Sequence, residues 1–129
     1  MSNPMRVPAI LLLVILGLLA LGWVYGAVAN WDEIASRPVR LAYVIADFGL
    51  VIPIGVAAAA GLLRRARWSG PLFALALGLL LFDIAHGVLY LIWDNYFGIP
   101  LPAGFGLLGL TLLYTWYGMR SLLRKDGGP

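Results

Sequence analysis

The sequence predicts an all-α membrane protein: a bundle of four transmembrane helices in one domain, residues 1–129, with both termini in the cytoplasm. Of its 129 residues, 62% are hydrophobic and only 12% are charged, whereas soluble domains carry about 25% charged residues. The mean hydropathy is +0.92. Apolar runs of about 20 residues, the length that a bilayer core requires, occur four times and are separated by short connections containing Pro, Gly or charge.

The first predicted helix covers residues 8–29. Arg6, the apolar run after it and the "AVA" at residues 27–29 also fit a cleaved secretory signal peptide. The apolar run, however, continues through Trp23 to full spanning length, which favours an uncleaved membrane helix. Gly22 and Gly26 have GxxxG spacing, which permits close helix packing.

The second predicted helix covers residues 39–63 and contains Pro53 in its middle. A proline inside a helix removes one backbone hydrogen bond, so we expect a bend here and a freed carbonyl. The run "AAAAG", from Ala57 to Gly61, provides a surface of small residues. We expect that surface to pack within the bundle, or against a second copy of the chain.

The third and fourth predicted helices cover residues 71–93 and 103–123. The third contains Asp83 and His86, although an Asp at the centre of a membrane helix costs about 2.5 to 3.5 kcal/mol. At 100° per residue, its polar groups fall on one face; they are Asp83, His86, Gly87, Tyr90 and Asp94. The fourth helix has Thr111, Tyr114 and Thr115 on one side. Such faces point into a bundle or a cavity and away from lipid.

The cations predict the orientation. One side of the membrane would hold seven of the nine, and the other only Arg37 and Arg40. The seven are Arg6, Arg64, Arg65, Arg67, Arg120, Arg124 and Lys125. Because positive charge gathers on the cytoplasmic side, both termini are expected there, in the cytoplasmic membrane of a cell. Aromatic belts are expected at both interfaces, with Trp23 in the outer one.

The polar faces of the second and third helices are expected to meet in a pocket in the outer half of the bundle. Arg40, Tyr43 and Asp47 share one stripe, and Asp47 lies about 10 Å below Arg40. His86 lies about 10 to 12 Å below the same surface, so a pairing of Asp47 with His86 is expected. Asp83 lies a turn deeper, near the expected level of Tyr114.

Three functions are consistent with these residues. The first is binding or transfer of a small cationic or lipophilic molecule, or of protons, because carboxyl and imidazole groups in lipid attract cations and exchange protons. The candidate residues are Asp47, Asp83, His86, Tyr43, Tyr90, Tyr114 and Thr111. The second is an accessory or scaffold subunit whose polar network is purely structural. The third is a membrane enzyme that uses Asp83 and His86 as acid and base on a lipophilic substrate.

Other classes are disfavoured. With one His and no Cys, a metal site could use only Asp47, Asp83 and His86, so we expect no metal. We also expect no cofactor, no catalytic motif and no nucleic-acid partner. The expected partners are the lipid bilayer and a second copy or a larger membrane complex, because four helices are too few for alternating access by a single copy.

Residues 45–74, "IADFGLVIPIGVAAAAGLLRRARWSGPLFA", contain an Asp, a Pro six residues later, and an apolar half-helix that ends in Leu-Leu-Arg-Arg. This segment resembles a pattern in uncharacterised small bacterial integral membrane proteins. The resemblance covers about a quarter of the chain and matches at Asp47 and Pro53. It implies a bacterial four-helix membrane protein, and it carries over no substrate and no catalytic residue.

Overall fold

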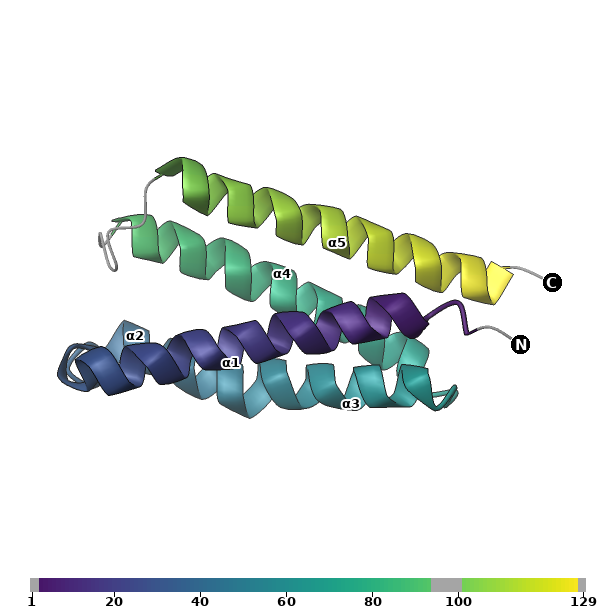
Figure 1. Ribbon diagram of the computed structural model, residues 1–129, viewed down its shortest axis with the longest axis horizontal. Coiled ribbons are helices and arrows are strands. Elements are labelled where there is room, and N and C mark those ends of the chain that lie inside the picture. The colour runs from purple at the N-terminus through teal and green to yellow at the C-terminus, as the bar shows by residue number, and fades with distance from the viewer. Residues whose placement is uncertain (1–2, 94–100, 128–129) are drawn as a thin grey trace.

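In the computed structural model, which describes residues 3–93 and 101–127, every element is a helix. For residues 91–93, 101 and 125–127 only the backbone is described. The elements in chain order are α1 (Arg6–Ala35), α2 (Pro38–Ala46), η1 (Asp47–Val51), α3 (Ile52–Leu63), α4 (Ser69–Trp93) and α5 (Leu101–Gly127). Because α2, η1 and α3 continue into one another, the described chain forms four long helical rods (Figure 1). The prediction of an all-α, four-helix architecture is confirmed.

The rods lie side by side, and both ends of the bundle are recognisable from their charges. Helix α1 begins, α5 ends and α3 connects to α4 at the same end, on the right of Figure 1. This arginine end carries the exposed side chains of Arg6, Arg64, Arg65, Arg67, Arg120 and Arg124. The opposite end carries the exposed Asp32 and Glu33 on α1 together with the exposed Arg37, and we name it the acidic end after its two acids. Asp94, which we expected on the polar face of the third helix, lies outside the described residues.

Three of the described helical rods are long and apolar enough to cross a membrane: Arg6–Ala35, Pro38–Leu63 and Ser69–Tyr90. Helix α5 has 27 residues but is less apolar, because Thr, Tyr, Trp and Gly interrupt its leucines. Helix α1 continues to Ala35, beyond its expected end at residue 29. The backbone at Asn30 is non-helical, with φ −146° and ψ 46°, so the expected boundary coincides with a kink.

The helices pack most closely towards the arginine end. A Cβ atom built on Gly61 would lie 2.8 Å from Trp68 and Ser69, and one on Gly118 would lie 3.0 Å from Leu77. These glycines therefore allow α3, α4 and α5 to approach one another. In the "AAAAG" run, Gly61 is buried whereas Ala57 is exposed. Near the other end, Gly26 is buried, but a Cβ on Gly22 would meet nothing within 4 Å, so the expected close contact at Gly22 is not found.

The second rod is irregular just before Pro53. The backbone N–H of Ile52 donates a hydrogen bond to the carbonyl of Asp47, five residues back, which makes residues 47–51 a π-helical turn. Pro53 has no N–H to continue the ordinary ladder, and the wider turn accommodates this loss. The irregularity that Pro53 predicts thus lies in the turn before it, and Asp47 stands at the start of that turn.

Candidate functional site

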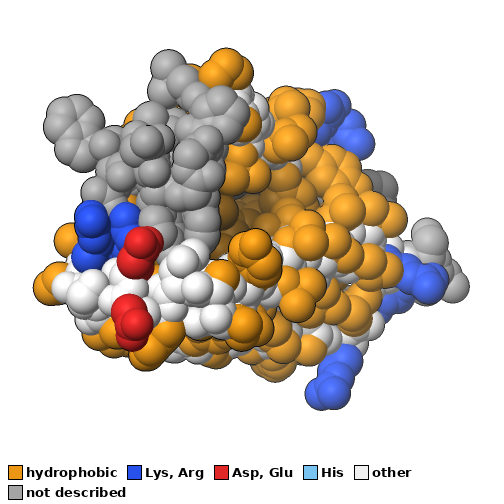
Figure 2. Space-filling view, turned by 60° about the vertical axis from the view of Figure 1, so that its left-hand side comes forward, with side chains coloured by type: hydrophobic (Ala, Val, Ile, Leu, Met, Phe, Trp, Pro, Cys, Tyr) orange, Lys and Arg blue, Asp and Glu red, His pale blue; other side chains and the backbone are white. Residues whose placement is uncertain are grey.

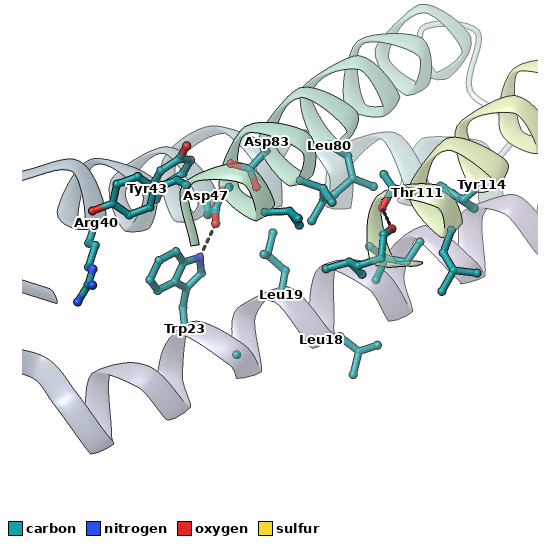
Figure 3. Close-up of a pocket in the computed structure, with 18 residues that line it drawn as sticks. Leu18, Leu19, Trp23, Arg40, Tyr43, Asp47, Leu80, Asp83, Thr111 and Tyr114 are labelled. Atoms are coloured by element: carbon teal, nitrogen blue, oxygen red, sulfur yellow. Dashed lines mark hydrogen bonds between the residues drawn. The ribbon is translucent and has the colours of Figure 1, made fainter. Parts of the chain in front are cut away.

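A cavity of about 540 Å³ lies between α1, α2, η1, α4 and α5. Figure 3 shows its lining residues, with polar side chains gathered at one end and leucines between them and Tyr114. The polar lining residues are Trp23, Arg40, Tyr43, Asp47, Asp83, Tyr90, Thr111 and Tyr114. The remaining lining is apolar or glycine. Asp47 and Asp83 therefore line a common cavity, which is longer and more apolar than a pocket confined to two helices.

Asp47 is the most deeply buried charged residue of this cavity, with only 1% of its surface exposed. The indole Nε1 of Trp23 donates a hydrogen bond to its Oδ2 atom. Its Oδ1 atom, also buried, meets no permanent hydrogen-bond donor among the described residues, where the neighbouring carboxyl of Asp83 can donate to Asp47 only when it is protonated. An unsatisfied buried acceptor costs about 1 to 3 kcal/mol. When Asp83 is ionised, one acceptor at the polar end of the cavity is thus available to a bound molecule.

The carboxyl group of Asp83, on α4, lies beside that of Asp47, and both line the cavity (Figure 3). Two neighbouring carboxylates repel each other when both are ionised, so a bound cation or a shared proton stabilises the pair. From the sequence we expected both groups in one pocket between the second and third helices, and in the structure their carboxyl groups lie next to each other.

His86 does not pair with Asp47, contrary to our expectation. Its Nδ1 atom is hydrogen-bonded to the hydroxyl of Tyr43, and its ring stacks on Phe82, with 5.5 Å between ring centroids and an interplanar angle of 12°. It is exposed and does not line the cavity. The reason is angular, because three residues along a helix leave His86 about 60° away from Asp83. That offset turns the imidazole to the outer side of Tyr43.

The other candidate residues divide into cavity walls and helix contacts. Tyr90 lines the polar end, where its ring centroid lies 5.8 Å from that of Tyr43. Thr111 donates its hydroxyl to the carbonyl of Leu107, at 2.9 Å, within its own helix. Tyr114 donates to the carbonyl of Pro8, at 2.8 Å, and so joins α5 to the start of α1.

Tyr114 therefore closes the far end of the cavity and does not lie level with Asp83. The neighbours of Gly118 are Leu77 and Phe73 on the antiparallel α4, which places Tyr114 about one helical turn closer to the arginine end than Asp83. Depth estimates from helix rise alone cannot include the relative shift of two helices, and this shift accounts for the difference.

Two residues of the polar end were not among our candidates. Trp23, which we expected in an aromatic belt, points inward to Asp47. Arg40 is buried, with 3% exposed, lines the cavity and forms an ion pair of 3.5 Å with Glu33 of α1. Arg40 lies on the same helical stripe as Asp47, so it could have been counted among the candidate site residues from the sequence. Nothing in the sequence, in contrast, pairs Trp23 with a carboxylate 24 residues away.

Within residues 3–93 and 101–127, no three His, Asp or Glu side chains are placed to hold a metal ion. Asp47 and Asp83 are adjacent, but His86 is turned to Tyr43. The chemistry available at the polar end is therefore that of two carboxyl groups and hydrogen-bonding side chains beside a long apolar wall. No family model matches this sequence, and neither a curated protein nor a solved structure is significantly similar to it.

Proposed function

We propose that this chain is a multi-pass protein of a bacterial cytoplasmic membrane that binds a small amphiphilic molecule in the cavity between its helices. The molecule has an apolar body and a head group that is cationic or donates hydrogen bonds. Asp47 and Asp83 accept the head group, Tyr43 and Tyr90 line its surroundings, and the leucines of α1, α4 and α5 cover the body.

The membrane orientation is supported by the six exposed arginines at the arginine end, which we assign to the cytoplasm. Helix α5 serves as the fourth span, because its 27 residues measure about 40 Å at about 1.5 Å per residue and it runs antiparallel to α4. Four spans place both termini on the same side.

The observation that carries the proposal is the carboxyl pair of Asp47 and Asp83 in the cavity wall, where the buried Oδ1 atom of Asp47 meets no donor among the described residues other than a protonated Asp83. An ammonium group can take the place of a shared proton and donate hydrogen bonds to both carboxylates. A cavity of about 540 Å³ is also within the range of small-molecule sites, about 300 to 1,000 Å³, which are mostly apolar with a few polar groups.

The rival functions have less support. Acid–base catalysis by Asp83 and His86 needs both groups at one substrate, and His86 lies outside the cavity wall. Proton binding would use the same carboxyl pair, and a cationic ligand would displace the proton that the two carboxyl groups share. An accessory role, in a homodimer or a larger complex, requires an outward helix surface that binds a partner, such as the surface around Ala57. Purification of the protein together with a stable membrane partner would support that role.

The test measures binding of dodecylamine to the purified protein in phosphatidylcholine nanodiscs, with empty nanodiscs subtracted. Asp47→Asn keeps the size of the side chain and removes its charge, so we expect at least a tenfold loss of affinity. The matched control is Asp32→Asn, an exposed acid at the acidic end, which should leave the affinity unchanged. Dodecanol, with the same chain and no charge, should bind more weakly than dodecylamine. Equal affinity of the Asp47→Asn variant and the unmodified protein would contradict the proposal.

A further inference from the structure

The cavity is closed on one side and open on another. Its wall on α4 is internal, because Leu80 and Val88 are only 1% and 6% exposed. On α1 and α5, by contrast, several lining residues also lie on the outside of the bundle. Leu18 is 64% exposed and Leu110 is 66% exposed, and Gly22 is exposed as well. Among the described residues, the cavity therefore opens between α1 and α5.

Figure 2 shows this face of the molecule hollowed, with apolar side chains around the hollow. Helix α5 packs along α4 but meets α1 at few positions. One of these contacts is the hydrogen bond from Tyr114 to Pro8, near the arginine end. In a bilayer, a surface bordered by leucines faces acyl chains and not water. The opening thus connects the carboxyl groups with the hydrocarbon region.

We infer that the ligand is a single-chain aliphatic amine of the bilayer that enters sideways between α1 and α5. Its ammonium group reaches Asp47 and Asp83, and its chain lies along α1 with the tail towards Tyr114. This inference rests on the proposed function and adds the ligand class, the route and the direction of binding. On this route the apolar chain moves from the lipid directly into the cavity and never enters water.

The dimensions of the cavity fit this ligand. The lining residues of α1 extend from Ile15 to Trp23, a rise of about 12 Å at about 1.5 Å per residue, so a straight chain of about ten carbons fits along them.

The test compares Gly22→Trp with Gly17→Trp. Both glycines are exposed on α1, and a Cβ on either meets nothing within 4 Å, but only Gly22 lines the cavity. The rates of dodecylamine association and dissociation are measured in nanodiscs. A Trp at the opening should slow both rates at least fivefold, whereas Gly17→Trp should change neither. If Gly22→Trp abolishes binding by filling the cavity, Gly22→Val is measured in the same way.

If dodecylamine associates and dissociates at the unmodified rates in both Gly22 variants while its binding still depends on Asp47, the lateral route is overturned. The proposed function would then still stand. Absence of Asp47-dependent binding would contradict the proposed function itself. The direction is checked with dodecylamine carrying a photoreactive diazirine at its tail, which should label α1 or α5 near Tyr114. Labelling confined to the acidic end would overturn it.

Occupation of the opening by a second copy is tested with cysteines, since the chain has none of its own. Copies carrying Gly22→Cys are mixed with copies carrying Leu110→Cys and are then oxidised. Efficient cross-linking between the two copies would overturn the inference, and its absence supports a face that is open to lipid.

Discussion

The two halves of the bundle differ in how their helices are held together. Towards the arginine end, Gly55, Gly61 and Gly118 bring helices so close that an added Cβ would touch Leu16, Trp68 or Phe73. Towards the acidic end, Cβ atoms added to Gly22 or Gly106 would meet nothing within 4 Å, and α1, α4 and α5 enclose the cavity instead. The same four rods thus pack tightly at one end and leave a cavity at the other.

The difference extends to the kind of contact. Lipid is as apolar as leucine, so helix association in a bilayer depends on close packing and on hydrogen bonds between helices. The arginine end combines packing around Phe73 with hydrogen bonds such as that from Tyr114 to Pro8, whereas the half with the cavity has fewer packed side chains and depends on the bonds of Trp23 with Asp47 and of Tyr43 with His86. We therefore expect substitutions of equal size to have different effects in the two halves.

The largest difference is expected between two phenylalanines of α4. Phe73 is 0% exposed, whereas Phe82 is 71% exposed. Phe73→Ala opens a hole in the packed end and should lower the free energy of unfolding by about 3 kcal/mol, while Phe82→Ala should change it by less than about 0.5 kcal/mol. Unfolding in mixed detergent micelles measures both values. Similar losses for the two variants would remove the distinction between the halves.

The next effect is expected from a matched pair of glycine substitutions. Gly61→Ala forces a methyl group against Trp68 and Ser69 and should cost about 1 to 3 kcal/mol. Gly78→Ala meets no atom within 4 Å and should stabilise its helix by up to about 1 kcal/mol. Thermal unfolding in the same detergent distinguishes them. A destabilised Gly78→Ala variant would show that the free space around a glycine does not predict the effect of an added methyl group on stability.

The smallest of the three effects is expected at the polar end of the cavity. Trp23→Phe removes the hydrogen bond to Asp47 and should cost about 1 kcal/mol, whereas Trp31→Phe, half exposed on the same helix, should cost almost nothing. The measurement is again the free energy of unfolding. A Trp23→Phe variant as stable as Trp31→Phe would mean that this hydrogen bond does not hold α1 to the second rod.

Much of the site followed from the periodicity of the helices. Asp47, Asp83, Tyr43 and Tyr90 were expected around one pocket, because a helix of known period assigns each residue to a face. The partner of Asp47 was not predictable, since the indole of Trp23 comes from a helix whose rotation about its own axis no sequence pattern specifies. His86 was misplaced for the same reason, as a 60° sector is too broad to distinguish the cavity wall from the outer side of Tyr43.

The sequence by itself determined that the chain forms long apolar helices, where they begin and end to within four residues except at the end of α1, and which of them carry carboxyl groups that lipid disfavours. These properties depend on composition and on contacts between near neighbours. The tertiary structure alone decided that α1 and α5 stay apart, that the cavity opens between them, and that the carboxyl group of Asp83 comes to lie beside the buried carboxyl group of Asp47. Those features depend on the distances and rotations between helices, which many side chains set together.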